Sequence, residues 1–302
     1  MGLSFAPIHA KMESAEWSDV LRWSQRVIEL ADGDPAKGNF LFGSPLAGAF
    51  PSRALARYWL GRHGWREDMN AGLATAGSAD PMSYATVVSV VYFPAIPMGV
   101  LAADDHAVRQ IEDALRIAQR SGDDVAWGLA RATLGIAQVH RQTAADRDYG
   151  HKLLAEVSEV FVHRGHNLCD LPIVNVYLAR ERARRGDRDG AVPLMRTAVD
   201  HLVRQGRLLS WGVAATGVLV ETLLDRGADG DVAEAEAAIK RLAAAPADDG
   251  LAVRDIWLLR LQALLARARG EGVRYLDFTN RYSAMATSLG FEGHITWAEA
   301  MA

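Results

Sequence analysis

Tryptophan side chains recur near the starts of expected helices, where an indole ring can stack on a ligand. Arginines of the expected helices can pair with a carboxylate through the guanidinium. Trp127, Trp211, Trp257 and Trp297 each fall within about the first two turns of such a helix. We expect a binding groove whose candidate residues are Trp127, Arg131, Arg180, Arg184, Trp211, Trp257 and Arg260. Tryptophan also buries a large area where repeats pack together, and this packing role is the alternative for each ring.

Arginines are densest in residues 180–188, a segment that could hold an anion or an acidic partner if several side chains faced one way. Glu181 precedes Arg185 by one helical turn, which is the favourable orientation for an ion pair, and Asp187 follows. The pattern therefore favours a solvated face whose charges neutralise one another.

One group of residues has the chemistry of metal ligands. His163, His166 and Cys169 are spaced by two residues each, near an expected helix end. Zinc sites of this kind are usually built on paired Cys-x-x-Cys spacing, which is missing here. The sequence therefore favours an ordinary loop between helices over a zinc site.

Catalytic motifs are missing from the sequence. The segment 38–44 has the glycine spacing of a phosphate-binding loop but not its Gly-Lys-Ser/Thr ending, so it is interpreted as a tight loop. The sequence has no Gly-x-Ser-x-Gly and no His-Glu-x-x-His. The pairs Asp104-Asp105 and Asp123-Asp124 are better explained as helix caps than as acid–base partners. We expect no enzyme activity and no cofactor.

Short breaks rich in glycine and aspartate, residues that end one helix and cap the next, separate alanine- and leucine-rich stretches along the chain. From residue 104, alternate helices open near Asp104, Asp146, Asp187, Asp231 and Glu271, at intervals of 42, 41, 44 and 40 residues. An interleaved set opens near Asp124, Asn167, Ser210, Gly250 and Glu292. This period is typical of helical repeats. It predicts an all-α, right-handed α-solenoid of about six to seven tetratricopeptide-like hairpins.

We expect one helical-repeat domain over residues 1–302, with divergent hairpins at 1–103, regular repeats at 104–291 and a capping helix at 292–302. The early part predicts helices over 14–30, 45–62 and 65–76. Residues 86–93 favour a strand by β-branched propensity. We predict a buried helix there, opened by Asp80 and Pro81, because a lone strand would have no partner.

The composition narrows the classes of partner. The 302 residues carry a net charge of −4, which provides no cationic field for nucleic acid or for an anionic membrane. One cysteine excludes an intrachain disulfide and fits the cytoplasm. The sequence has neither a signal peptide nor an uninterrupted apolar span, so we expect no membrane association.

Several segments carry a resemblance to a known family, namely residues 33–40, 42–46, 95–97, 180–190, 215–231, 255–260 and 285–294. They resemble the C-terminal tetratricopeptide-like region of mycobacterial multidomain cyclase–ATPase regulators, over most of the chain. In that family a class III nucleotidyl cyclase domain and a P-loop signalling ATPase precede the helical region. The motifs of neither domain occur here, so no catalytic residue carries over.

The resemblance implies a non-catalytic regulatory or sensor scaffold in signal transduction. Its expected partner is a protein segment, or an attached ATPase or cyclase domain, held in the concave groove. The alternative is a helical-repeat domain that senses a small-molecule effector in the same groove.

Overall fold

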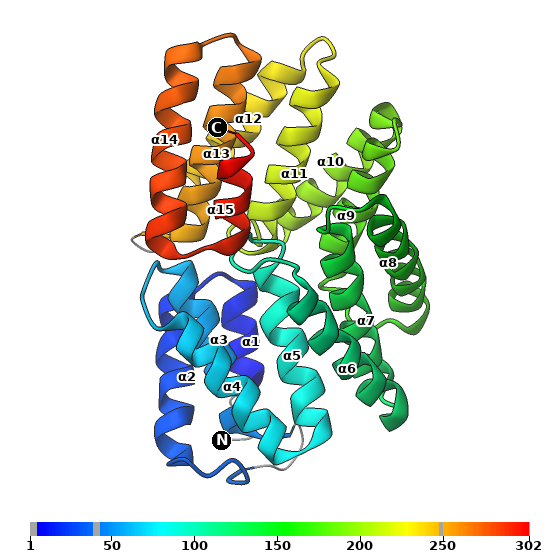
Figure 1. Ribbon diagram of the computed structural model, residues 1–302, viewed down its shortest axis with the longest axis vertical. Coiled ribbons are helices and arrows are strands. Elements are labelled where there is room, and N and C mark those ends of the chain that lie inside the picture. Colours follow the sequence, from blue (N-terminus) through cyan, green and yellow to red (C-terminus); the bar gives the residue numbers. More distant parts are fainter. Residues whose placement is uncertain (1–4, 39–42, 248–249, 302) are drawn as a thin grey trace. The chain divides into compact units, whose positions relative to one another are not determined.

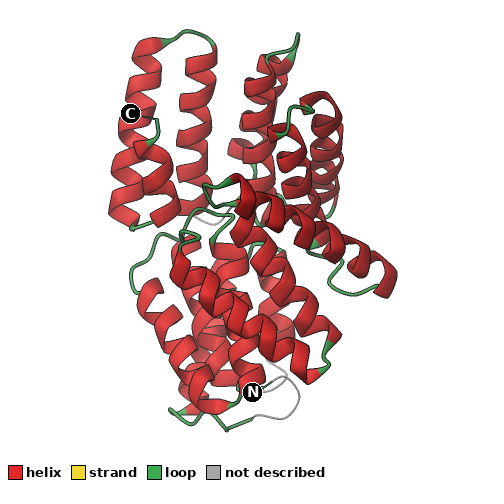
Figure 2. Ribbon diagram, turned by 45° about the vertical axis from the view of Figure 1, so that its right-hand side comes forward, coloured by secondary structure: helices red, strands yellow, loops and turns green. Residues whose placement is uncertain are grey.

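The chain is helical throughout the part that the structure describes (Figure 1). The structure is a computed structural model that describes residues 5–38, 43–247 and 250–301, and these ranges form fifteen helices. Figure 2 colours the same ranges by secondary structure and shows helices and loops, with no strand among them. The expected all-α class is confirmed. Most of the loop expected at residues 38–44 lies outside the described residues.

Two compact units make up the chain. The first, unit 1, comprises Met1–Ile96 and Ala103–Asn167 and contains α1 (Phe5–Glu13), α2 (Trp17–Ala31), α3 (Pro45–Trp59), α4 (Trp65–Ala79), α5 (Pro81–Ala95), α6 (Asp105–Ser121), α7 (Asp124–Val139) and α8 (Ala144–Arg164). The second, unit 2, comprises Pro97–Ala102 and Leu168–Ala302 and contains α9 (Leu171–Arg184), α10 (Arg188–Arg204), α11 (Trp211–Arg226), α12 (Asp231–Ala244), α13 (Ala252–Ala268), α14 (Gly272–Leu289) and α15 (Glu292–Glu299).

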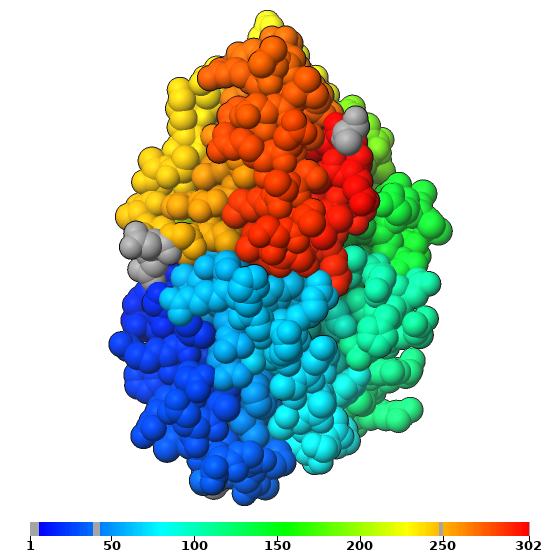
Figure 3. Space-filling model, turned by 60° about the vertical axis from the view of Figure 1, so that its left-hand side comes forward, coloured from blue at the N-terminus to red at the C-terminus, as the bar shows by residue number. Residues whose placement is uncertain are grey.

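Consecutive helices pair as hairpins, and the hairpins stack within each unit. In unit 1 the first helices of the hairpins, α3, α5 and α7, pack in sequence, with α4, α6 and α8 as their second helices. In unit 2 the first helices α9, α11 and α13 pack in the same way, and α15 follows against α14. Figure 3 looks onto α14, in orange, whose outer face is open to solvent. Within each unit, a hairpin buries its apolar side against the next hairpin of that unit, which is the packing that the repeat period predicts.

Side-chain caps explain why the helices begin where they do. Asp80, Asp104 and Asp123 each accept hydrogen bonds from backbone N–H groups of the helix that follows, at 2.8 to 3.0 Å. The helix expected to open near Asp146 begins at Ala144, because Thr143 is its cap and accepts a bond of 3.1 Å from the Asp146 N–H. Glycines in the left-handed region end four of the described helices, at Gly122, Gly165, Gly227 and Gly290.

The segment with strand propensity is a helix, as predicted. Val88 and Val91 are buried on α5, which packs against α3, α4, α6 and α7. This burial outweighs the small helix penalty of β-branched residues. The sequence pattern did not predict α1, and α2 begins at Trp17 rather than at Ser14.

Residues 97–102, which we call the strap, belong to unit 2 although they connect α5 to α6. The carbonyls of Gly99 and Val100 accept hydrogen bonds of 3.0 Å from the backbone N–H groups of His294 and Glu292, at the start of α15. The Ala102 N–H donates to Oε2 of Glu292, also at 3.0 Å. The strap therefore satisfies backbone donors that the first turn of a helix otherwise leaves open.

A helix needs about 20 apolar residues to cross a bilayer. Over the described ranges, none of the helices combines that length with that apolar character.

Candidate functional site

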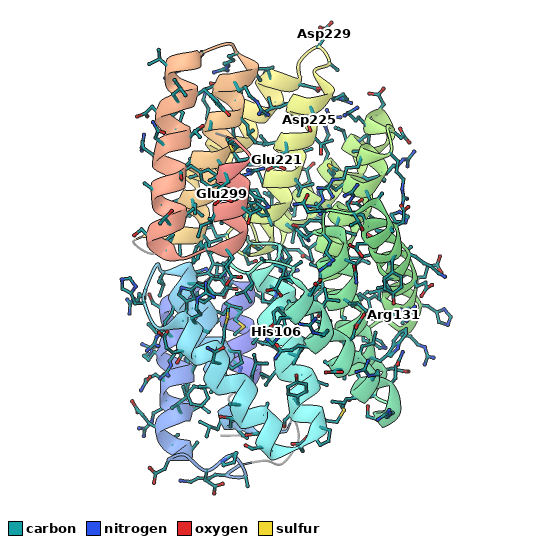
Figure 4. All side chains as sticks on the ribbon, in the orientation of Figure 1. His106, Arg131, Glu221, Asp225, Asp229 and Glu299 are labelled. Atoms are coloured by element: carbon teal, nitrogen blue, oxygen red, sulfur yellow. The ribbon has the colours of Figure 1, made fainter. Side chains whose placement is uncertain are left out.

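Four charged side chains occupy equivalent positions on successive first helices of unit 2. Arg180 lies on α9, Glu221 on α11, Arg260 on α13 and Glu299 on α15, at intervals of about 40 residues. We call this set the charged row, and its charges alternate in sign. Figure 4 labels its acidic members on α11 and α15. The repeat thus brings residues that are distant in sequence onto neighbouring helices.

Arg260 links three elements of unit 2. Its Nε donates to Oε1 of Glu221 at 2.8 Å, and its guanidinium carbon lies 5.2 Å from the centre of the Trp297 ring. The Arg260 side chain is only 14% exposed. Burial opposes its charge, but Glu221 and Tyr282 together outweigh that cost, and the pKa of Arg260 lies above its ordinary value. This guanidinium is a fixed cation.

Arg180 has a similar environment on α9. Its guanidinium carbon lies 4.4 Å from the centre of the Tyr177 ring, and its Nε is 3.7 Å from Oε1 of Glu181. Arg184 donates to the same carboxylate oxygen at 2.7 Å. Burial, together with the charge of Arg184, lowers the pKa of Arg180 to about 10. Arg180 therefore remains charged at neutral pH.

Arg131 repeats this arrangement in unit 1. Its guanidinium carbon lies 5.2 Å from the centre of the Trp127 ring on the preceding turn of α7, and it forms an ion pair with Glu156 of α8. Figure 4 labels Arg131. Three of the predicted arginines thus combine an aromatic face with a glutamate. A guanidinium in this arrangement can bind the carboxylate of a partner, which would compete with the glutamate that is already paired with the arginine.

Two of the predicted tryptophans lie in the packed interior. Trp257 is 2% exposed, its ring lies against Gly217, and its ring centre is 5.5 Å from that of Trp297. Trp211 is also buried, at the start of α11. Packing between repeats accounts for the positions of both rings without a ligand.

A buried polar pair that sequence reasoning missed lies close to Arg260 of the charged row. Tyr282 on α14 and His294 on α15 are both fully buried, and the Tyr282 hydroxyl is 2.8 Å from Nδ1 of His294. Burial, aided by the charge of Arg260, holds the pKa of His294 well below its ordinary value. Neither residue belongs to a motif, so only the fold identifies the pair.

The three residues with metal-ligand chemistry do not belong to one unit. His163 and His166 are part of unit 1, and Cys169 is part of unit 2. His163 is exposed near the end of α8, and the ring of His166 lies edge-on to Phe161 at 6.5 Å. The zinc hypothesis stays a prediction.

Trp127 lines a pocket in unit 1. The pocket has a volume of about 320 Å³ and lies between the end of α6, the start of α7 and the end of α8. Its other chemically distinctive side chains are Gln119, Asp123, Asp124 and Arg164. Arg164 and Asp124 form an ion pair of 3.0 Å beside the indole. The pocket therefore offers one aromatic surface with charges of both signs.

Comparisons of the sequence with models of known protein families and with curated proteins give no match in either case. The resemblance to cyclase–ATPase regulators stays a prediction. Functional assignment therefore depends on the residues and their geometry.

Proposed function

We propose that this chain is a non-catalytic regulatory scaffold of the cyclase–ATPase signalling type, acting in the cytoplasm. Its partner is an acidic protein segment, or an acidic surface of an ATPase or cyclase domain, held on the first helices of the hairpins. The observation that carries the proposal is the guanidinium that recurs with an aromatic ring on one side and a glutamate on another, at Arg131, Arg180 and Arg260.

The pairing of these arginines sets a condition on the partner, which must replace one carboxylate with another. A guanidinium buried without an anion would be costly, so each is paired within the chain. A partner carboxylate that displaces Glu221 from Arg260 would release Glu221 toward solvent, which already reaches 28% of that side chain. The aromatic ring stays in place and keeps the guanidinium oriented during the exchange.

Occupancy of the charged row can be transmitted mechanically. Each hairpin contacts mainly its neighbours, so a partner that touches α9, α11 and α13 together would restrict their relative motion. Such a partner shifts the population toward the arrangement it binds best. A regulatory output follows without any chemistry in this chain.

The test is a reconstituted signalling assay. A full-length cyclase–ATPase relative is assayed for cyclase and ATPase output with its own helical region present or deleted, and then with this chain added to the deleted form. We expect the chain to change the output in a saturable way. Unchanged output in every arm would refute the assignment to this signalling class.

A matched pair of variants tests the charged row. Arg260→Ala removes an arginine that contacts Glu221 and Trp297, whereas Arg281→Ala removes an exposed arginine on α14. We expect Arg260→Ala to weaken the effect at least tenfold and Arg281→Ala to leave it within twofold. Equal behaviour of the two variants, with circular dichroism confirming that both fold, would exclude the charged row as the binding face.

The second candidate function is the sensing of a small-molecule effector, and the pocket beside Trp127 favours it. An aromatic ligand that carries both charges could stack on Trp127 and pair with Asp124 and Arg164. Quenching of indole fluorescence that is lost in Trp127→Leu and kept in Trp23→Leu would support this candidate. A panel of nucleotides and amino acids that leaves the fluorescence unchanged would refute it.

A further inference from the structure

A second pocket in unit 1 has none of the arginines of the proposed function in its lining. It has a volume of about 330 Å³, is lined by α1, α3 and α5 and opens to solvent. Ile8 and Met12 line it from α1, Gly48 from α3, and Val87 and Val90 from α5. Its wall is mostly apolar, with four hydroxyl side chains and His9 as the remaining polar groups.

The hydroxyl groups of this pocket that are buried are already used within the protein. Ser52 donates to the Gly48 carbonyl at 2.9 Å, and Ser44 donates to the Pro35 carbonyl at 2.6 Å. Ser83 donates to Oδ2 of Asp80 at 2.6 Å and accepts from the Ser44 N–H. A charged ligand would therefore lose its hydration without gaining buried partners, which is unfavourable.

His9 is the titratable residue that lines this pocket, and it does not supply a buried charge. The His9 side chain is 63% exposed, and its Nε2 lies 3.8 Å from Oε1 of Glu13. A carboxylate ligand at His9 would therefore approach a glutamate as well. The pocket selects against ionised molecules of either sign.

The size of the pocket suits a small molecule. Its volume of about 330 Å³ lies at the lower end of the range of ligand pockets, which is about 300–1,000 Å³. An apolar cavity of about 150 Å³ accepts benzene.

We infer that the pocket between α1, α3 and α5 binds an uncharged, predominantly apolar small molecule about the size of two or three fused or linked rings. The site is independent of the charged row. Binding would tie α1 to α3 and α5, since residues of all three helices line the pocket.

The test uses two fluorescent probes with the same ring skeleton. N-phenyl-1-naphthylamine is uncharged, and 1-anilinonaphthalene-8-sulfonate adds one sulfonate to it. Titrated into the full chain, the uncharged probe is expected to bind at one site per chain and at least tenfold more tightly than the sulfonate. Equal affinities would overturn the choice of ligand class, and failure of the uncharged probe to bind would overturn the site.

Two valine-to-tryptophan substitutions, one in the pocket lining and one outside it, test where the uncharged probe binds. Val90→Trp fills the pocket from α5, and Val125→Trp places the same side chain at an exposed position of α7. We expect Val90→Trp to weaken binding of the uncharged probe at least tenfold and Val125→Trp to leave it within twofold. Unchanged binding in Val90→Trp would place the probe elsewhere and refute the site.

A third variant keeps the test decisive if Val90→Trp does not fold. Thr86 is an exposed residue of the lining, so Thr86→Lys should be tolerated while it adds an ammonium at the pocket mouth. The uncharged probe should then bind more weakly and the sulfonate more tightly than in the unmodified chain. If neither affinity changes, the inference is wrong. Because none of these variants touches Arg131, Arg180 or Arg260, failure here leaves the proposed function unaffected.

Discussion

Gly217 of α11 lies directly against the indole ring of Trp257 on α13, so that a methyl group at residue 217 would overlap the six-membered part of that ring. Replacement of glycine by alanine in a helix normally stabilises it by about 1 kcal/mol. At this position overpacking should prevail, and Gly217→Ala should lower the free energy of unfolding by about 1–3 kcal/mol.

Urea denaturation measures this effect against a matched control. Gly77 on α4 has space for a methyl group, since its nearest neighbour there would be the Tyr84 ring at 3.9 Å. Gly77→Ala should therefore leave stability unchanged or raise it. If Gly217→Ala is also neutral or stabilising, Trp257 can move and the close packing of α11 and α13 is not rigid.

His294 makes stability depend on pH. Its pKa in the folded protein lies well below the ordinary value of 6.5. Between these two pKa values, His294 binds a proton in the unfolded chain but not in the folded protein. Neutral His294 therefore contributes fully to the free energy of unfolding above about pH 6.5. As the pH falls below this value, the free energy of unfolding decreases with a slope of up to about 1.4 kcal/mol per pH unit.

Unfolding measured between pH 7.5 and pH 5 should show a shallower pH slope in His294→Gln than in the unmodified chain. The readout is the slope, because the substitution itself will alter stability at every pH. His201→Gln, at an exposed position of α10, is the control and should keep the original slope. An unchanged slope in His294→Gln would show that other groups cause the pH dependence.

Asp68 should be a stability determinant of unit 1. Its buried carboxylate accepts hydrogen bonds from Nε and an amino group of Arg53 at 2.8 and 2.5 Å and lies 2.9 Å from Arg57. Asp68→Asn removes the charge that compensates two arginines, and should cost about 3–5 kcal/mol.

The matched control for Asp68 is another aspartate of unit 1. Asp113 forms an ion pair with Arg116 on α6, but both side chains are at least half exposed. Asp113→Asn should produce no measurable change in the denaturation midpoint, because solvent screens such pairs. Similar losses in both variants would mean that Asp68 acts through something other than its buried charge.

The pairing of Glu221 with Arg260 should appear as an energetic coupling. Glu221→Gln, Arg260→Met and the double variant form a cycle, and we expect a coupling free energy of about 0.5–3 kcal/mol. The exposed pair of Asp277 and Arg281 on α14 provides a reference cycle with little coupling. A coupling at Glu221 and Arg260 no larger than in the reference would contradict the 2.8 Å contact in solution.

The sequence predicted the helices more completely than the candidate site, and particular residues show why. Asp104 and Asp123 are local signals, because a cap acts on the helix directly after it. The environment of Trp257 depends on Gly217, some 40 residues earlier, and no local rule connects the two.

The sequence also does not predict how α11 is oriented about its own axis. Residues 211–220 are all buried. Because apolar and polar residues do not alternate along this stretch with the period of a helix, the sequence does not indicate which face of the helix would line a groove. For this reason the tryptophans could be assigned to the right helices but not to buried or exposed positions. Tyr282 and His294 were missed because their pairing exists only once α14 and α15 are adjacent.

The strap has a consequence for how the protein is made. The Ala102 N–H and the Glu292 carboxylate that accepts its hydrogen bond are separated by 190 residues. A ribosome therefore releases residues 97–102 long before it has synthesised α15, and domains emerge amino end first. The contacts between the strap and α15 can form only after translation has passed residue 294. Residues 168–302 expressed alone would lack the strap. The backbone N–H groups of Glu292 and His294 would then lose the carbonyls that accept their hydrogen bonds at the start of α15.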